Sequence, residues 1–309
     1  MITVIGFNTA IDRLIRLDAL RPGEVSRALG EQVYPGGKGL HVAQTIAALG
    51  ERVQLVGLVD PAHRNMIGRL MCERGVLFHG IEVTDNLRTC IALQDANGQI
   101  TEILGQGPLL DSAQQEALLR AFRHGVDDSD LIVLSGSLPR GFSSTTYAEL
   151  AAHVRDAGKR CLLDASGELL RHAVPAQPFL VKPNRDEITE LFGRPISDPA
   201  AAVEAVRELQ ARGIAMPVVT LGVLGAVAAD ASGIWHAAIE LAQVRNTVGS
   251  GDCLLAGMAV GMARSMNLEE TLRLGVACGA ANAQGEETGF VERRAVEALL
   301  SQVRVHRLA

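Results

Sequence analysis

The sequence has few of the features that mark secreted, membrane-bound or nucleic-acid-binding proteins. Aromatic residues make up 3% of the 309 residues and the formal net charge is −6, so neither base stacking nor a basic binding surface is expected. The five cysteines are odd in number and lack a C-x-x-C pair, which argues against a disulfide framework or a zinc site. We find no charged leader and no apolar run long enough for a bilayer. We therefore expect a cytoplasmic protein that binds neither nucleic acid nor membranes.

Two common nucleotide-binding fingerprints are also missing. The glycine cluster Pro35-Gly-Gly-Lys-Gly39 lacks the spacing of a Walker A loop, and the first strand does not lead into G-x-G-x-x-G. The cluster does place a lysine and a closely approachable backbone at the start of a helix, which suits ligand binding. An ordinary glycine turn before a helix is the alternative for this motif taken alone.

Short apolar runs alternate with longer helical patterns, which predicts an α/β fold. A hydrophobic content of 48% allows a large core, and we expect one domain over residues 1–309. Nearly all-apolar strands indicate a doubly wound, mostly parallel sheet covered on both faces; they are Ile2–Phe7, Val53–Val59, Leu131–Ser135, Arg160–Asp164, Phe179–Val181 and Val218–Leu221. The expected helices are Leu40–Leu49, Met66–Arg74, Ser112–His124, Thr145–Ala157, Asp186–Phe192 and Pro199–Arg212, and residues 252–301 are mostly helical.

Two segments break this alternation and predict a small antiparallel lid, at approximately residues 11–35 and 88–105. The turn Asn97-Gly98 is a strong hairpin signal. The expected lid strands are Ile11–Asp18, Glu31–Tyr34, Arg88–Asp95 and Gln99–Leu104. A small sheet with one apolar face must cover a substrate or pair with another subunit, and we expect a homodimer through the lid.

The run Asn246-Thr-Val-Gly-Ser-Gly-Asp-Cys253, which opens a helical pattern, predicts phosphate chemistry. Gly249 and Gly251 let the backbone bring N–H groups close to an anion, at the positive end of the helix dipole. Asp252, in the first turn, is placed to accept a proton from an attacking hydroxyl. On these residues alone, a glycine loop with Asp252 as a helix-capping residue explains the pattern equally well.

Seven motifs in sequence order resemble the phosphofructokinase-B branch of the ribokinase-like sugar kinases. The resemblance covers nearly the whole chain and is closest to the sugar-phosphate kinases, such as 1-phosphofructokinase and tagatose-6-phosphate kinase. The motifs are Asn8-Thr-Ala-Ile-Asp12, Gly36-Gly-Lys-Gly39, Thr101-Glu-Ile-Leu-Gly-Gln-Gly-Pro108, Ser135-Gly-Ser-Leu-Pro139, Val181-Lys-Pro-Asn184 with Glu187, Thr220-Leu-Gly222 with Gly225-Ala226, and Val248-Gly-Ser-Gly-Asp252.

The resemblance implies a role for each matching residue. Asp252 would be the catalytic base, and the N–H groups of Gly249, Ser250 and Gly251 would form the anion hole for the transferring γ-phosphoryl. The implied substrate-side residues are Asp12, Gly36, Gly37, Lys38, His41 and Ser137. The implied ATP-side residues are Lys182, Asn184, Thr220, Gly222, Gly225, Gly249, Gly251 and Asn282.

Asn184 and Glu187 match the family's N-x-x-E element, which organises Mg²⁺ largely through its waters. The same spacing also fits a helix cap with a carboxylate at its third position, and both roles are compatible.

Specificity is expected to depend on cations near the lid. Arg27 and Arg88 would clamp a substrate phosphate, with exposed solubility charges as the alternative for each. Related sugar-phosphate kinases usually have Asn in place of His41 and Ser26, and an acidic residue in place of Gly105, which leaves the sugar open. His41 would donate to a sugar hydroxyl or to the phosphate, in which case KM would vary near the ordinary histidine pKa.

We therefore expect an ATP- and Mg²⁺-dependent kinase of a hexose phosphate: fructose 1-phosphate, fructose 6-phosphate or tagatose 6-phosphate. The product would be a bisphosphate, and lid closure would exclude water. Cys253, where a Ser is common, is expected to be a buried small residue. The alternatives are a kinase of an unphosphorylated sugar or nucleoside, and a catalytically silent sugar- or nucleotide-binding regulator on the same fold.

Overall fold

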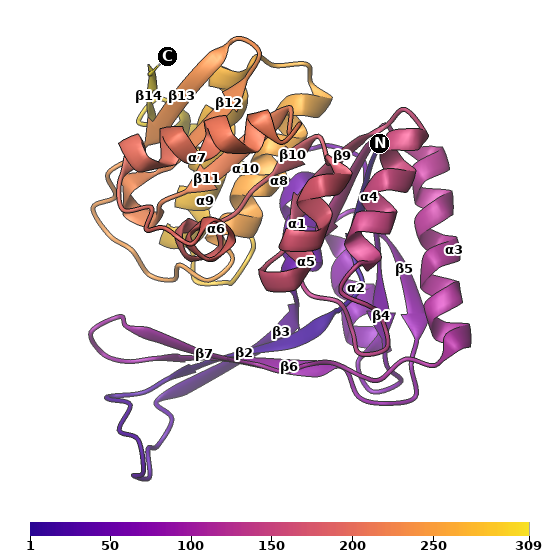
Figure 1. Cartoon of the computed structure of the whole chain (residues 1–309). Helices are drawn as coiled ribbons and strands as arrows, with labels where there is room; N and C mark the ends of the chain where they lie inside the picture. Colours follow the sequence, from indigo (N-terminus) through magenta and orange to yellow (C-terminus); the bar gives the residue numbers. More distant parts are fainter. Residues whose placement is uncertain (309) are drawn as a thin grey trace.

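The computed structural model describes residues 1–308, which form a large mixed sheet between helices and a small projecting second sheet (Figure 1). The large sheet has ten strands, in the spatial order β14 (Arg304–Arg307), β13 (Gly233–Ala238), β12 (Ala226–Asp230), β11 (Met216–Thr220), β10 (Leu180–Val181), β9 (Arg160–Asp164), β8 (Leu131–Ser135), β1 (Ile2–Gly6), β4 (Val53–Val59) and β5 (Val76–Glu82). Strands β11 through β5 of this order run parallel, and β12, β13 and β14 are antiparallel.

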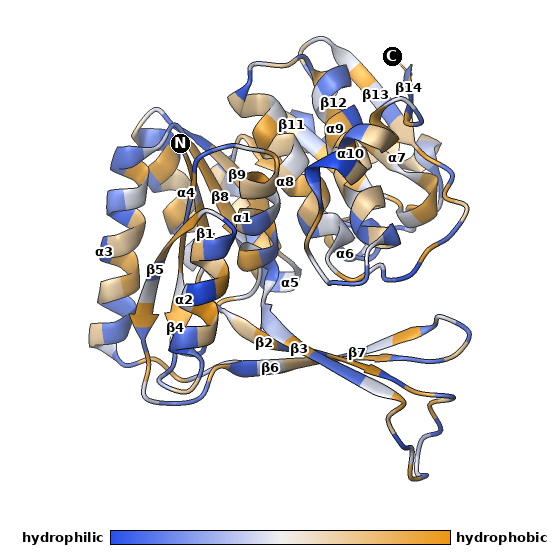
Figure 2. Cartoon of the chain, turned by 180° about the vertical axis from the view of Figure 1, so that it is seen from behind, coloured by the Kyte–Doolittle hydropathy of each residue, from blue (hydrophilic) through white to orange (hydrophobic). Residues whose placement is uncertain are grey.

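Helices cover both faces of this sheet, as the two opposite views show (Figures 1 and 2). One layer contains α1 (Lys38–Ala48), α8 (Ser250–Ala263), α9 (Leu268–Gln284) and α10 (Arg293–Leu300). The other face carries α3 (Ser112–Asp128), α4 (Thr146–Asp156) and α7 (Pro199–Ala211). The remaining helices are α2 (Arg64–Glu73), α5 (Gly167–Ala173) and α6 (Arg185–Phe192), with short 3₁₀ turns at Val174–Ala176 and Gly222–Leu224.

The core follows from the sequence pattern. All residues of β1, β4 and β8 are buried, as expected for strands with a helix layer on each face. Helices α8 and α9 pack closely because small residues face each other: a Cβ added at Gly257 would lie 2.8 Å from the Cα of Gly275. Cys253 is buried in this layer, as expected. Within residues 1–308, no helix combines the length and apolarity needed to cross a membrane.

The second sheet is the predicted lid. Its four strands lie in the order β3 (Gly30–Gly36), β2 (Ala10–Arg16), β6 (Arg88–Gln94) and β7 (Ile100–Leu104). Strands β2 and β6 are parallel, because they come from two separate insertions, whereas β2 pairs with β3 and β6 with β7 as antiparallel hairpins. The turn at Gly98 has a positive φ of 79°. The sheet extends below the main body in Figure 1, with the 17–29 loop at its far end.

The fold class expected from the sequence is confirmed, with differences at the edges of the large sheet. The predicted interior strands and crossover helices are present, most with boundaries shifted by one or two residues. Helix α3 runs four residues beyond its predicted end at His124, to Asp128. Four strands were not predicted: β5 at one edge and the antiparallel β12, β13 and β14 at the other.

Candidate active site

A cavity of about 1230 Å³ lies between the lid and the carboxyl ends of the parallel strands. Its floor includes Gly136, Asp164, Lys182 and Thr220, which end or directly follow β8, β9, β10 and β11. The lid contributes residues from all four of its strands, namely Asp12, Leu14, Tyr34, Arg88, Cys90 and Glu102. The carboxyl edge of a parallel sheet is the usual place for a ligand in such folds.

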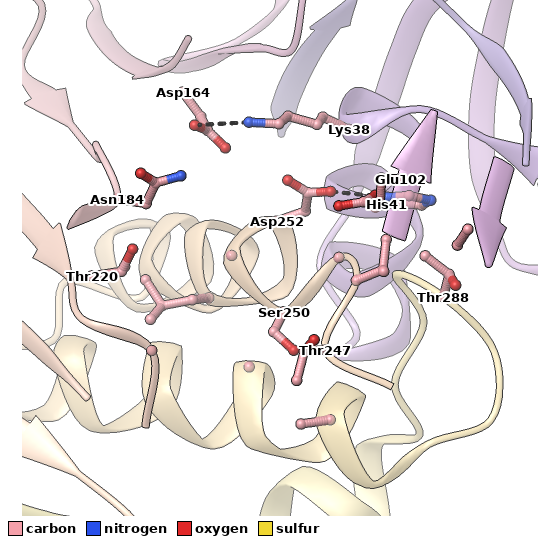
Figure 3. A pocket seen from close by; sticks show the side chains of 18 of the residues that line it. Lys38, His41, Glu102, Asp164, Asn184, Thr220, Thr247, Ser250, Asp252 and Thr288 are labelled. Atoms are coloured by element: carbon pink, nitrogen blue, oxygen red, sulfur yellow. Dashed lines mark hydrogen bonds and ion pairs between the residues drawn. The ribbon is translucent and has the colours of Figure 1, made fainter. Parts of the chain in front are cut away.

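Asp252 lies in the first turn of α8, beside this cavity (Figure 3). The helix begins at Ser250 after Gly249, which has a φ of 81°, and no side chain caps its N-terminus. A Cβ at Gly249 would meet the backbone N of Gly289 at 2.7 Å, so this turn needs glycine. The uncapped N–H groups and the helix dipole favour an anion at this end of the cavity.

His41 lies between two carboxylates. Its Nδ1 is 2.8 Å from Oδ2 of Asp252, and its Nε2 is 3.1 Å from Oδ2 of Asp12, a close ion-pair contact without hydrogen-bond alignment. Both ring nitrogens face carboxylates here, and a contact of His41 with the sugar or its phosphate stays a prediction. Burial opposes the charged ring, but the two carboxylates outweigh it and raise the pKa of His41 to about 10. If His41 influences KM for the sugar, this raised pKa moves the expected pH dependence above the ordinary histidine pKa.

A second charged cluster surrounds Asp164. Its Oδ1 is 3.4 Å from Nζ of Lys38, its Oδ2 is 3.3 Å from Nζ of Lys182, and its side chain is 1% exposed. Burial opposes ionisation of Asp164, but Lys182 and Lys38 outweigh it and lower its pKa. Lys182 is also the group that a Cβ at Gly251 would approach, at 3.4 Å, so its ammonium lies next to the start of α8. Two cations therefore adjoin the helix N-terminus.

Asn184 and Glu187 form a complete capping box at the start of α6. The Asn184 side-chain oxygen accepts from the N–H groups of Asp186 and Glu187, both at 2.9 Å, and Glu187 Oε2 accepts from the Asn184 N–H at 2.8 Å. Burial raises the pKa of Glu187, whose Oε1 lies 4.0 Å from Nζ of Lys38. The predicted helix-cap role is confirmed, and one carboxylate oxygen of Glu187 remains outside the cap.

Most of the predicted site residues line the one cavity. These are Asp12, Gly37, Lys38, His41, Arg88, Ser137, Lys182, Asn184, Thr220, Gly222, Gly225, Gly249, Ser250, Gly251 and Asp252. Arg88 is held by two backbone carbonyls: its Nε donates to Asn8 O at 3.0 Å and its Nη1 to Gly105 O at 3.4 Å. Ser137 accepts a hydrogen bond from the Asn8 side chain at 2.9 Å.

Arg27 does not line the cavity. It is exposed in the 17–29 loop, which the β2–β3 hairpin carries away from Arg88 (Figure 1). The prediction that the two arginines converge is therefore wrong within one chain, because the sequence does not show how far this hairpin extends.

Asn282 and Gly36 have supporting positions behind the cavity wall. Asn282 is fully buried; it donates to Val248 O and to Ser250 Oγ, both at 2.9 Å, and accepts from the Gly289 N–H at 2.7 Å. It lies under the loop that precedes α8, and its predicted place beside the nucleotide stays a prediction. Gly36 lies against Asp12: a Cβ there would be 2.1 Å from the Asp12 carboxyl carbon, so glycine is required.

The cavity lining also includes residues that were not identified as site residues from the sequence, among them the charged Asp164, Glu102 and Arg185. Asp164 ends a buried strand at the carboxyl edge of the sheet, a position that is itself a signal. Glu102 reaches the cavity from β7. Partial burial and the negative charges of Asp12 and Asp252 raise the pKa of Glu102, although solvent still reaches its side chain. Arg185 donates to Leu221 O at 2.7 Å beside the nucleotide-side loop.

A mostly parallel sheet with a β lid, and a carboxylate at an uncapped helix N-terminus facing a lysine pair, define a ribokinase-like phosphotransferase. A family model described as pfkB family carbohydrate kinase matches residues 2–294, and the chain belongs to this family. It is accordingly an enzyme that transfers a phosphoryl group from ATP.

The similarity to individual proteins extends over the whole chain. The sequence is 32% identical over 308 residues to 1-phosphofructokinase of Bacillus subtilis, covering 100% of both chains. A putative phosphofructokinase from Staphylococcus aureus has a TM-score of 0.81 at 30% identity, over 100% of this chain and 99% of that one. Phosphofructokinase-2 from Escherichia coli, solved in complex with substrates and products, has a TM-score of 0.89 at 25% identity, over 97% and 98% of the two chains.

Proposed function

We propose that the protein transfers the γ-phosphoryl group of ATP to a hexose monophosphate, giving a bisphosphate, with Asp252 as the general base. The observation that carries this proposal is the position of Asp252 in the first turn of α8, with Lys182 next to the same helix start. In the proposed step, the sugar hydroxyl attacks phosphorus as Asp252 takes its proton. The N–H groups at Gly249 to Gly251 and the lysines stabilise the charge on the transferring group.

A phosphorylated sugar is favoured over a plain one by Arg88. Its guanidinium lies in the cavity at the base of the lid, and its backbone contacts hold the planar fork in place. The similarity to 1-phosphofructokinase of Bacillus subtilis supports a phosphofructose as the acceptor. We therefore keep fructose 1-phosphate, fructose 6-phosphate and tagatose 6-phosphate as the candidate substrates.

Mg²⁺ is proposed as the metal cofactor. Mg²⁺ retains several waters and takes few protein oxygens, so it needs only one or two nearby carboxylates. Glu187 fits this requirement, because its Oε1 is not used in the capping box, whereas the Asn184 oxygen already accepts two hydrogen bonds. When bound, the metal would neutralise charge on the ATP phosphates, and Glu187 would hold its waters.

A homodimer through the lid is proposed from the face opposite Asp12. By strand register, Arg13, Ile91, Ile103 and Val33 share that face, and Ile103 and Val33 are 56% and 45% exposed. A sheet that leaves these residues in water is expected to pair with a second copy. A strictly monomeric mass by light scattering at micromolar concentration would contradict this assembly.

The function is tested by ATP turnover with fructose and its two monophosphates, together with tagatose 6-phosphate. We expect turnover with at least one monophosphate and little with fructose. Arg88→Ala should raise KM for that monophosphate by roughly 10–100-fold, because a charge-assisted hydrogen bond contributes about 1.5–3 kcal/mol, and leave KM for ATP unchanged. If fructose is phosphorylated as efficiently as its monophosphates and Arg88→Ala changes neither, the enzyme is a plain-sugar kinase. ATP turnover with none of the panel would favour the regulator alternative.

A further inference from the structure

The two ring nitrogens of His41 bring together three separate elements of the chain. His41 belongs to α1, Asp12 to strand β2 of the lid, and Asp252 to the catalytic turn of α8. The side chains of His41, Asp12 and Asp252 are only 4%, 14% and 7% exposed. The contact therefore forms a shielded connection between the lid and the proposed base, and Figure 3 shows the part between His41 and Asp252.

The position of the ring is fixed by Gly289, which packs against it. A Cβ added at Gly289 would lie 2.1 Å from Cγ of His41, and this glycine has a φ of 68°. The Gly289 carbonyl accepts from the Gln44 side chain at 2.6 Å and from the Thr45 hydroxyl at 3.4 Å, one turn further along α1. The ring is thus confined on the side opposite the carboxylates.

The protonation state of His41 follows from this geometry. A neutral imidazole carries one N–H and can donate to only one carboxylate, so its unprotonated second nitrogen would lie beside the negative charge of the other carboxylate. Carboxylate oxygens lie at 2.8 Å from Nδ1 and 3.1 Å from Nε2. Only the imidazolium is attracted to both.

We propose that His41 is a positioning residue that, as an imidazolium, holds Oδ2 of Asp252 and ties it to Asp12 of the lid, leaving Oδ1 to take the substrate proton. This role rests on the proposed function of Asp252 as the base. Among residues 1–308, no residue forms a hydrogen bond with Oδ1 of Asp252, so this oxygen is available for the substrate proton while Oδ2 is held by His41. An Asn at position 41 would donate one hydrogen bond but supply no charge.

The surrounding charges agree with a protonated ring. Burial works against the charge, but Asp12 and Asp252 together raise the pKa of His41 to about 10, so the ring loses its proton only as the pH rises through that value. The other ionisable groups facing the cluster are Lys38 on α1, Glu102 on β7 and Tyr34 on β3. Of these, only Lys38 is a cation, and its amine is paired with Asp164.

The first test is the pH profile of kcat in His41→Asn. Without the imidazolium, Asp252 faces Asp12 directly and is easier to protonate, so the acid limb of kcat should move to higher pH by about one unit or more, with KM for ATP unchanged. His124→Asn, which changes an exposed histidine, is the matched control and should leave the profile in place. A uniform loss of kcat without movement of the limb would mean a packing role only, and would overturn the proposal.

The second test does not depend on catalysis. In protein labelled at histidine Cε1, the resonance that disappears in His41→Asn identifies His41, and it should show the imidazolium form beyond pH 8. In Asp12→Asn, which keeps the ring, deprotonation should occur at lower pH. A neutral His41 at pH 7 would overturn the proposal even in an active kinase. Conversely, a protonated His41 in a protein that phosphorylates no tested sugar would leave the ring's role as a lid tether and refute the proposed function instead.

Discussion

The two charged clusters of the cavity are arranged with opposite sign. At the lid end, two carboxylates, Asp12 and Asp252, enclose one cation, His41. At the sheet end, two lysines, Lys38 and Lys182, enclose one carboxylate, Asp164. Each buried charge is therefore partnered. Among these six residues, the surplus is negative beside the proposed base and positive where phosphate oxygens are proposed to bind, and Glu187 lies 4.0 Å from Lys38 at the edge of the sheet cluster.

This difference shows how one cavity can serve two chemical needs. A base next to surplus cations would be a weak proton acceptor, whereas phosphates next to surplus carboxylates would be repelled. The chain has three lysines, and two of them meet at Asp164, which concentrates ammonium groups at the sheet end. Asp252 connects the lid cluster to the sheet end, because α8 starts beside Lys182 while the Asp252 carboxylate is directed to His41.

The largest effect is expected from removing the negative charge of Asp252, the proposed base at the lid end. Asp252→Asn preserves the shape of the side chain and should lower kcat by about 10²–10⁴, the usual contribution of a general base, with KM for ATP nearly unchanged. Steady-state kinetics with the best hexose phosphate measures this. Asp127→Asn, which changes an exposed carboxylate on α3 away from the cavity, is a control for loss of charge alone. Near-normal turnover in Asp252→Asn would remove this residue from the mechanism.

A smaller effect is expected from removing a cation at the sheet end. Lys182→Met should raise KM for ATP by roughly 10–100-fold, the equivalent of one charge-assisted hydrogen bond, and change KM for the sugar little. Lys159→Met is the matched control, because Lys159 pairs with Asp130 at the surface. The opposite pattern, a raised KM for the sugar alone, would mean that the sheet end binds the sugar phosphate rather than ATP.

The interior of the fold could be predicted from the sequence because its signal is local. Strands β1, β4 and β8 are buried along their whole length, which leaves a continuous apolar run in the sequence. The missed strands lie at the edges of the sheet, where this signal fails. β5 has one buried residue, Val76, so it lacks a continuous apolar run. Three of the five residues of β12 are alanines, which suit a helix equally well.

The site was predictable to the extent that glycines and motif order mark it. Gly249 and Gly36 mark positions where any Cβ would collide with Gly289 or Asp12. The sequence contains no comparable signal for the orientation of side chains. Nothing local in the sequence shows that His41 is directed between two carboxylates or that Asn282 lies beneath a loop, since both depend on contacts more than thirty residues away.

Asn282, an uncharged residue beneath the loop that precedes α8, should affect the stability of the protein rather than the charges at either end of the cavity. Asn282→Ala would leave Val248 O and the Gly289 N–H without their buried partner, at a cost of about 1–3 kcal/mol in the free energy of unfolding. Urea unfolding measures it, and Asn97→Ala, at the exposed hairpin turn, is a control. A variant with native stability but a large rise in KM for ATP would indicate that Asn282 contributes to nucleotide binding instead.

The smallest effect concerns the hydroxyl that joins the lid to the loop before α10. Tyr34 Oη lies 3.0 Å from Thr288 Oγ1, which also accepts from Asn246 at 2.8 Å, so removing the phenol leaves Thr288 with one partner. Tyr34→Phe should raise KM for the hexose phosphate by about 2–10-fold, since a neutral hydrogen bond contributes about 0.5–1.5 kcal/mol, without moving the pH profile.

The second of the chain's two tyrosines offers the control for this change. Tyr147 is fully buried, and its hydroxyl has no hydrogen-bond partner among the described residues. Tyr147→Phe should therefore leave KM for the sugar unchanged. If Tyr34→Phe is equally silent, the lid is held near the sugar by the charged contact of Asp12 with His41 alone. If Tyr34→Phe also moves the acid limb of kcat, the hydroxyl and the imidazolium act as one unit, and the lid end depends on both.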